Sequence, residues 1–361
     1  MRPLDIQKEV WFNVPMTFPY QKLSAGLVAD LQPRARDILS RRFGLEAQEP
    51  ETLEAIGQSH GITRERVRQI VEDGIQQLQE LAKEQAKLQE IFEEFLGVLR
   101  ESGHVKRQDL LIEELGAPKA ANHIVFLLHL GDQFHKHKET EFVYPFWASK
   151  KEIVEISPQL LEAVYNYLDE GKETLEFDDL AKAYSSHDGE KINPRTLASL
   201  LEISKGIERA YNGKWGLTEW PEVYPKGMRD KAYVALRDEG KPLHFVEVAK
   251  AIERLQESLA EQRRKNVLPQ TVHNELIKDP RFVLVGRGTY ALDEWGYKPG
   301  TVKDVIMEIL RENGEAMTKE EIVQKTLDQR QVKESTILLN LQDKTCFYKD
   351  KEGEGYSCIG S

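Results

Sequence analysis

A short stretch near the N-terminus, TRERVRQIV at residues 63–71, carries side chains that can read the bases of double-stranded DNA. If a helix begins here, four polar residues fall at positions i, i+1, i+4 and i+5 and share one face. This reading face consists of Arg64, Glu65, Arg68 and Gln69. Arginine can bind guanine through two hydrogen bonds, glutamate can accept from the cytosine amino group, and glutamine can pair with adenine. The pattern therefore predicts base reading in a major groove, and a solvated charged helix is the less favoured alternative.

Three further residues are suited to the DNA backbone, namely Thr63, Arg66 and Thr52. Contacts to phosphate position a helix on the duplex without reading its sequence. Residues 63–71 hold three arginines and one glutamate, a net charge of +2, whereas the whole chain of 361 residues carries −11. Positive charge is thus concentrated where a groove helix needs it. The acidic balance of the chain argues against non-specific coating of nucleic acid, which depends on many phosphate contacts.

The flanking sequence contains the elements that must position this face. RARDILSRRF predicts a helix that ends near Gly44, and TLEAIGQSH predicts a short helix that begins at Thr52. Gly61 supplies a tight turn, and Thr63 caps the helix that carries the reading face. Two helices joined by a three-residue turn with glycine form a helix-turn-helix, whose second helix lies in the major groove. We assign residues 26–80 to this domain.

The remaining chain repeats one pattern with spacings of 68 to 74 residues between turn glycines at 103, 171, 240 and 314. The last copy has an amphipathic helix, the glycine turn, two further helical stretches and two short β-rich strings, which together predict a winged helix. The third copy ends the same way, and the first copy is the weakest match. The expected fold is mainly α, a helix-turn-helix domain followed by tandem winged-helix modules with small β-hairpin wings. The expected parts are an unassigned segment 1–25, the helix-turn-helix domain 26–80, an exposed helical linker 81–96, a divergent winged-helix module 97–149, and winged-helix modules 155–220, 225–296 and 300–361.

Composition and motifs exclude several classes of protein. Cys346 and Cys358 are too few for a disulfide framework or a four-cysteine metal site, and we expect two reduced thiols in a cytoplasmic protein. No stretch approaches the roughly 20 apolar residues of a spanning helix. No phosphate-binding loop or catalytic motif occurs, so we expect no enzymatic activity, no cofactor and no membrane association. A hairpin loop explains three nearby histidines better than a metal site does; they are His129, His135 and His137.

The third helices of the repeats carry little positive charge, as in NPRTLASLLEIS and KESTILLNLQDK. This favours protein over DNA as their partner. A short basic run, Arg263–Lys265, precedes the third helix of module 225–296, and a solvated loop is favoured there over phosphate contact.

Residues 31–78, from LQPRARDILSRRFGL to TLEAIGQSHGITRERVRQIVEDGIQQL, resemble region 4 of the bacterial sigma-70 family. The resemblance implies a domain that binds the −35 promoter element and the flap of the RNA polymerase β subunit, with base contacts from the reading face. It also implies that the preceding helix faces polymerase through Arg34, Ile38, Arg41, Arg42 and Phe43. The chain departs from the family at Glu72 and Asp73, where basic residues are usual, which weakens phosphate anchoring. Nothing resembles regions 2 or 3, so the chain is not expected to be a complete sigma factor.

Residues 226–295 are similar to the HARE-HTH winged-helix domain. That family includes the delta subunit of bacterial RNA polymerase and domains attached to restriction enzymes and chromatin proteins. The similarity implies association with transcription or DNA rather than catalysis, and it is weaker in the other repeats.

These observations favour a nucleoid-associated, DNA-binding transcription regulator with double-stranded DNA and RNA polymerase as partners. A first alternative is a scaffold that occupies the polymerase flap without reading DNA, which the acidic residues after the recognition helix favour. A second is a DNA-binding component of a DNA-modification or defence system. The sequence leaves the target site, the direction of regulation and the oligomeric state open.

Overall fold

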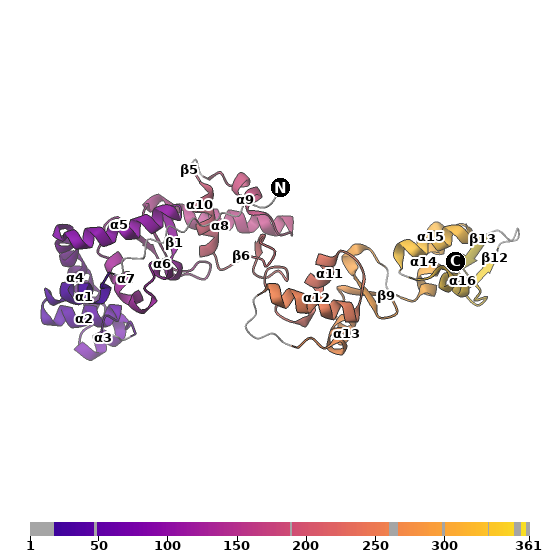
Figure 1. The fold of residues 1–361 in the computed structure, drawn as a ribbon, viewed down its shortest axis with the longest axis horizontal. Coiled ribbons are helices and arrows are strands. Elements are labelled where there is room, and N and C mark those ends of the chain that lie inside the picture. The colour runs from indigo at the N-terminus through magenta and orange to yellow at the C-terminus, as the bar shows by residue number, and fades with distance from the viewer. Residues whose placement is uncertain are drawn as a thin grey trace. The chain divides into compact units, whose positions relative to one another are not determined.

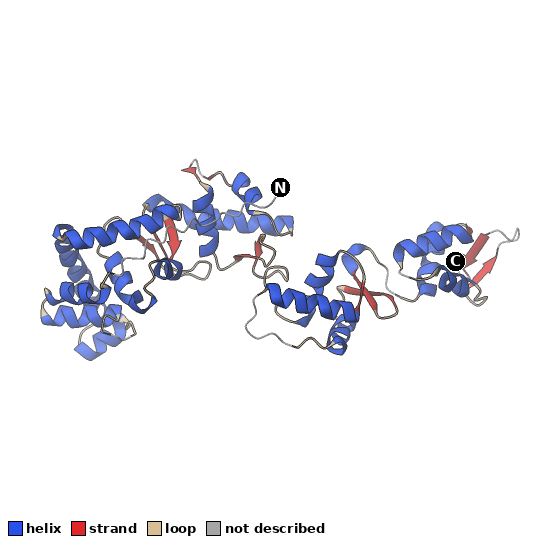
Figure 2. Cartoon of the chain, viewed as in Figure 1, coloured by secondary structure: helices blue, strands red, loops and turns tan. Residues whose placement is uncertain are grey.

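The protein is mainly helical with small antiparallel sheets (Figure 1), and helices dominate every part of it (Figure 2). It divides into two compact units, Met1–Glu208 and Arg209–Ser361. The computed structural model describes residues 18–46, 49–187, 190–259, 266–297, 300–330, 332–349 and 355–358. Most of the unassigned segment 1–25 and the basic run Arg263–Lys265 lie outside these ranges. Within them, no helix combines the length and the apolar character needed to cross a membrane.

Four helices open the first unit: α1 (Tyr20–Ala29), α2 (Pro33–Phe43), α3 (Leu53–His60) and α4 (Arg64–Glu84). A proline at the first position begins α2, and a left-handed Gly44 follows its last residue. Thr52 Oγ1 accepts the backbone N–H of Ala55 and caps α3. Thr63 Oγ1 accepts from Arg66 in the same way and caps α4. The predicted end of α2 at Gly44 and the predicted starts of α3 at Thr52 and of α4 at Thr63 are confirmed.

A second group of elements follows: α5 (Ala86–Glu101), β1 (Val105–Arg107), α6 (Gln108–Glu114), the 3-10 helix η1 (Pro118–Ala120), α7 (Ala121–Leu128), β2 (His135–His137) and β3 (Phe146–Ala148). The strands form an antiparallel sheet in the order β1–β3–β2. Lys106 of β1 and Lys136 of β2 lie on either side of Trp147 in β3. The sheet therefore has one strand more than the predicted two-stranded hairpin.

The first unit closes with α8 (Lys151–Gly171), α9 (Phe177–Ala183), β4 (Ser186–His187), β5 (Glu190–Lys191), α10 (Pro194–Ile203) and β6 (Ile207–Arg209), where the division falls. Helix α10 packs on the turn before β1. Thr196 Oγ1 donates to the Gly103 carbonyl at 2.8 Å, and Ser199 Oγ donates to the Ser102 carbonyl at 2.7 Å. Gly103 is left-handed with φ 75°, and a Cβ there would collide with the backbone of Thr196. The third helix of this repeat is therefore held against its own unit.

The second unit begins with β7 (Trp215–Leu217) and then holds two groups of elements, each with its own core. The first comprises α11 (Met228–Glu239), β8 (Leu243–His244), α12 (Phe245–Ser258), α13 (Pro269–Lys278), β9 (Phe282–Gly286), β10 (Thr289–Leu292) and the 3-10 helix η2 (Asp293–Trp295). The second comprises α14 (Val302–Asn313), β11 (Met317–Thr318), α15 (Lys319–Gln329), α16 (Glu334–Leu341), β12 (Phe347–Lys349) and β13 (Gly355–Cys358). The predicted capping box of Thr318 and Glu321 begins α15.

One order of elements therefore occurs three times: helix, strand, helix, helix, strand, strand. The two sheets of the second unit have the orders β8–β10–β9 and β11–β13–β12, which match β1–β3–β2 of the first unit. The short strand after the first helix was not predicted, because two or three residues are too few to show a strand period.

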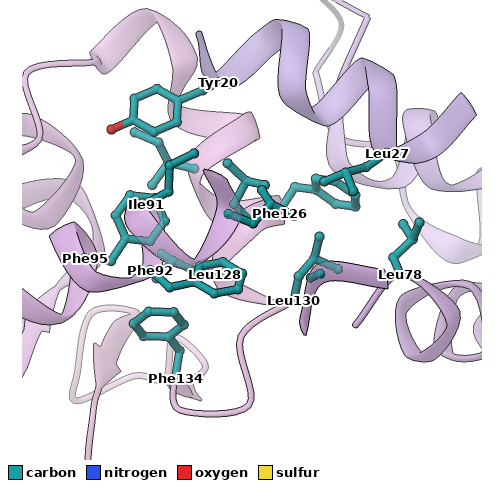
Figure 3. Packing of buried hydrophobic residues seen from close by; sticks show 14 of the residues in the cluster. Tyr20, Leu27, Leu78, Ile91, Phe92, Phe95, Phe126, Leu128, Leu130 and Phe134 are labelled. Atoms are coloured by element: carbon teal, nitrogen blue, oxygen red, sulfur yellow. The ribbon is translucent and has the colours of Figure 1, made fainter. Parts of the chain in front are cut away.

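The helix-turn-helix and the group that follows it share one hydrophobic core (Figure 3). Figure 3 shows side chains from α1, α4, α5 and α7 directed into this core; among its buried members are Leu27, Leu78, Ile91, Phe95 and Phe126. The rings of Phe43 in α2 and Phe126 in α7 meet edge to face with centroids 5.2 Å apart. The two parts are therefore packed as one body rather than joined by a spacer.

The expected exposed linker at residues 81–96 is wrong. The helix is interrupted at Gln85, between α4 and α5. One face of α5 is buried in the shared core through Leu88, Ile91, Phe92 and Phe95. The expected boundaries after residues 25 and 96 fall inside α1 and α5. Tyr20, from the segment left unassigned, is also buried in this core.

Candidate nucleic-acid interface

Helix α3, the turn and the start of α4 form a helix-turn-helix that a small apolar cluster holds together. Ile38, Ile56 and Val67 are fully buried in this cluster, one from each of α2, α3 and α4. Gly61 ends α3 with φ 62°, a conformation that costs glycine little. Packing and turn geometry together fix the direction in which α4 leaves the turn.

The reading face of α4 is exposed. All four of its residues are open to solvent, whereas Val67 between them is buried. Ile70 and Val71, which were predicted to point inward, are half-buried against the same cluster. The helix therefore presents polar side chains on one side and holds itself in place with the other, as the spacing predicts.

Two carboxylates of its own helix hold the Arg68 guanidinium. It donates to Glu65 at 2.7 and 3.0 Å and also to Glu72. The hydrogen bonds from Arg68 lower the pKa of Glu65, and those to Glu65 and Glu72 raise the pKa of Arg68. Arg68 can bind a base only after it leaves at least one of these partners. Arg64 forms no ion pair with any residue that the structure describes.

Thr52 and Thr63 stand at the N-termini of α3 and α4, and both are exposed. Each hydroxyl oxygen is used as a cap acceptor, which leaves its hydrogen able to donate to an anion. The N-terminus of a helix also attracts negative charge. This placement is compatible with the predicted phosphate contacts. Arg66, the third predicted contact, is exposed and donates to Gln69 Oε1 at 3.1 Å.

Residues 27–80, which run from the end of α1 to near the end of α4, match the family model described as Sigma-70, region 4. This part of the chain is a sigma-70 region 4 domain. The RNA polymerase sigma factor RpoS of Coxiella burnetii is 50% identical over 54 residues, 15% of this chain and 15% of that protein. The RNA polymerase principal sigma factor HrdD of Streptomyces coelicolor is 38% identical over 58 residues, 16% of this chain and 18% of that protein. The RNA polymerase sigma factor SigA1 of Synechococcus elongatus is 45% identical over 53 residues, 15% and 13% of the two chains.

The chain thus spans less than a fifth of the length of these relatives. The match suggests a transcription-related, DNA-binding role for the region 4 domain.

The arginines of α2 that were predicted to face polymerase have partners within the region 4 domain. Arg41 binds both carboxylate oxygens of Glu51 at 2.7 Å. Arg42 donates to the backbone carbonyl of Glu51 at 2.9 Å, and Arg34 donates to that of His60 at 3.3 Å. Arg34 is exposed, and the other two are half-buried.

Two members of the same predicted set point inward instead. Ile38 is fully buried in the helix-turn-helix cluster, so its assignment as a polymerase-facing residue is wrong. Phe43 is half-buried, with its ring against those of Phe126 and His129. Both side chains hold α2 in place.

The three histidines that first suggested a metal site do not meet in a hairpin loop. His129 directly follows α7, whereas His135 and His137 lie in β2. The ring of His137 stacks on Phe146 with centroids 4.8 Å apart. The described ranges contain no group of His, Cys, Asp and Glu side chains that could hold a metal ion. The interpretation as a loop is wrong, because these residues belong to a helix end and a strand.

Glu72, at a position where the family usually has a basic residue, is a partner of Arg68 that was not predicted. Glu72 lies four residues after Arg68, a spacing at which opposite charges on a helix pair. This rule could have found the contact.

Proposed function

We propose that the protein is a transcription regulator that reads promoter-like double-stranded DNA through α4 and associates with RNA polymerase, without being a complete sigma factor. The observation that carries this proposal is the exposed reading face on a region 4 domain. The relatives, named as RNA polymerase sigma factors, match only here and support DNA and polymerase as partners. The protein acts by binding alone, with no catalytic step or cofactor, at the bacterial nucleoid.

In this mechanism the N-terminal turns of α4 enter a major groove. Arg64 is free to bind guanine through two hydrogen bonds, while Glu65 and Gln69 face neighbouring base edges. Thr52 and Thr63 donate to phosphates on either side and fix the register.

Replacing Arg64 or Arg68 by alanine is expected to weaken specific DNA binding by about 1 to 3 kcal/mol, or about 5- to 150-fold. The measurement uses the full chain and duplexes that it selects from a random-sequence pool, at one fixed salt concentration. Arg100→Ala is the matched control, because Arg100 is an exposed arginine of α5 paired with Glu93. If both substitutions in α4 leave binding equal to that of wild type, the groove assignment is wrong.

Glu72→Gln is expected to strengthen binding by about 1 kcal/mol, or about fivefold. The substitution removes one of the two carboxylates that hold Arg68 and takes a negative charge away from the phosphates. Glu80→Gln, two turns further along α4 and paired with Lys83, is the control and should change nothing. Equal affinities for Glu72→Gln and wild type would show that Arg68 is not restrained in the complex.

We further propose that the three recurring groups, and the repeat of α8–α10, are winged-helix modules of the HARE-HTH kind that contact protein. In the first unit, α10 is packed on the turn before β1 and is not free to enter a groove. In the second unit, α13 and α16 expose Ile277 and Leu339, which are 63% and 67% accessible. Large exposed apolar side chains suit a protein surface better than a charged groove.

A scaffold that binds the polymerase flap without reading DNA is the second candidate, and the two carboxylates on Arg68 favour it. Capture of RNA polymerase core by the full chain without DNA, combined with the duplex measurement above, separates the two. Capture together with sequence-selective binding supports the regulator. Capture with no preference between selected and shuffled duplexes supports the scaffold.

A further inference from the structure

A pair of lysines lies close to the region 4 domain but outside its sequence. Lys136 is in β2, Lys138 directly follows the strand, and both are exposed. As alternate residues of an extended segment they lie on one side. The Lys136 ammonium is 5.3 Å from the ring centroid of Trp147, its cross-strand neighbour. Together with Arg42 of α2, these lysines form a surface termed the basic ridge.

A row of three rings connects the end of α2 to β3 through His129. The ring of Phe43 meets that of His129 at 5.1 Å, and His129 meets Trp147 at 5.0 Å, in both cases edge to face. Lys136 lies over Trp147, at the far end of this row, and Arg42 precedes Phe43 at its near end. The row therefore brings two parts of the chain that are distant in sequence into a fixed arrangement.

The charged groups of the ridge form no ion pair with the carboxylates that the structure describes. Partial burial lowers the pKa of Lys136, although the residue keeps an exposed surface, and the positive charges of Arg42 and Lys138 lower it further. The neighbouring Glu51 carboxylate is bound by Arg41, and Arg42 donates to the Glu51 carbonyl instead. In the part of the chain that the structure describes, no carboxylate forms an ion pair with a residue of the ridge. The ridge thus concentrates positive charge on a chain whose net charge is −11.

The ridge also borders the side of the helix-turn-helix that is expected to meet phosphates. The Glu51 carbonyl that accepts from Arg42 belongs to the residue directly before Thr52. Thr52 caps α3 and is exposed there. Arg42, and with it the basic ridge, therefore lies next to the N-terminus of α3, where a DNA phosphate is expected.

We propose that Lys136 and Lys138 bind phosphates of the same DNA duplex that α4 reads, and so extend the contact beyond the region 4 domain. This inference rests on the proposed function. Charge complementarity selects the occupant, because exposed lysines without acidic partners bind phosphates as point charges and release the counterions that surround DNA. The second group of elements then adds affinity without adding sequence specificity.

The salt dependence of binding tests the proposal. The full-chain variant K136Q/K138Q is compared with wild type on one selected duplex between 50 and 200 mM salt. Two lost phosphate contacts are expected to reduce the slope of log affinity against log salt by about 1.8. Between 50 and 200 mM salt, the ratio of the wild-type affinity to that of K136Q/K138Q should therefore fall about tenfold. The preference for the selected duplex over a shuffled one should stay the same, because the lysines read no bases.

Two variants serve as controls. K136R/K138R keeps both charges and should keep the wild-type slope. K172Q/K182Q removes two exposed lysines that each pair with an aspartate three residues earlier, and this variant should also keep the wild-type slope. Lys138→Gln alone, which leaves the contact with Trp147 intact, should lower the slope by about 0.9.

The outcomes separate this inference from the proposed function. If wild type prefers the selected duplex and the lysine variants keep its slope, the ridge does not contact DNA and the proposed function stands. If the slope falls but wild type shows no preference between duplexes, the ridge proposal stands and base reading fails. If the full chain binds no duplex, both base reading by α4 and phosphate binding by the ridge are overturned. The positive charge of the ridge would then suit an acidic protein partner instead.

Discussion

Replacing Phe126 by alanine is expected to lower the free energy of unfolding of the first unit by about 3 to 5 kcal/mol. Phe126 is fully buried in α7, and its ring packs on Phe43 of α2. The substitution removes contacts on both sides of the shared core. The helix-turn-helix should therefore open together with the α5–β3 group, and hydrogen exchange of the α4 and α5 amides should accelerate by similar factors.

Phe347→Ala is the matched control for this experiment. Phe347 is a buried phenylalanine of β12, in the separate core of the last group. Its loss should destabilise that group and leave exchange in α4 unchanged. Faster exchange confined to α5–β3 in the Phe126→Ala variant, with α2–α4 as in wild type, would contradict a single shared core.

The local features of the region 4 domain could be predicted from sequence, because they depend on neighbours along the chain. Thr63 caps α4 through an amide three residues away, and Gly61 is left-handed because the turn requires it. The reading face follows from helical spacing alone, with Val67 as its buried counterpart.

The shared core could be predicted only in part. Leu88, Ile91, Phe92 and Phe95 have the spacing of a buried helix face, a signal that the surrounding Glu, Gln and Lys residues masked. The groups that cover this face include Phe134, more than thirty residues later, and no local pattern indicates such a partner. An amphipathic face can be predicted from sequence, but not the surface against which it packs.

The candidate interface shows the same limit. The ion pair of Arg68 and Glu72 has the i, i+4 spacing of paired charges on a helix, so it could be predicted from the sequence. The basic ridge could not be predicted, because Arg42 and Lys136 are 94 residues apart and come close enough to influence each other only in the folded first unit. The sequence pattern around Lys136 is a strand of alternating His and Lys, which by itself indicates no partner.

Acidification is expected to weaken the shared core through His129. This imidazole lies edge to face against Phe43 and Trp147, and its Nδ1 donates to the Val125 carbonyl at 2.7 Å. Burial lowers the pKa of His129 to about 4; the bond to Val125 acts in the opposite direction, and the positive charges of Lys136 and Arg42 add to the effect of burial. The folded protein therefore keeps this ring neutral in a pH range where the unfolded chain protonates it.

The sign of the effect follows from these two pKa values. The unfolded value is about 6.5, so between pH 6.5 and 4 the unfolded chain binds more protons at this position and stability falls as the pH falls. His129 contributes its full stabilisation above pH 6.5. Relative to neutral pH, the free energy of unfolding should be lower by about 2 kcal/mol at pH 5 and by about 3 kcal/mol at pH 4.

Urea unfolding of wild type and His129→Gln at pH 7, 5 and 4 measures this contribution. Burial also lowers the pKa of His104 and His123, but both are present in both proteins and cancel in the comparison. Between pH 7 and 5, the free energy of unfolding should fall by about 2 kcal/mol more in wild type than in His129→Gln. Equal losses, or an imidazole signal of folded His129 that titrates near pH 6.5 by NMR, would contradict the assignment.

Protonation of His129 should also affect α4. Gln79 of α4 donates its side-chain amide to the His129 carbonyl at 3.0 Å, and Phe43 of α2 contacts the ring. Opening of the core at this position therefore releases α2 and α4 together, and α4 carries the reading face. Between pH 7 and 5, hydrogen exchange in α4 should rise in wild type more than in His129→Gln. An acid-induced rise confined to α7 would mean that the core yields locally and that α4 is held by its other contacts.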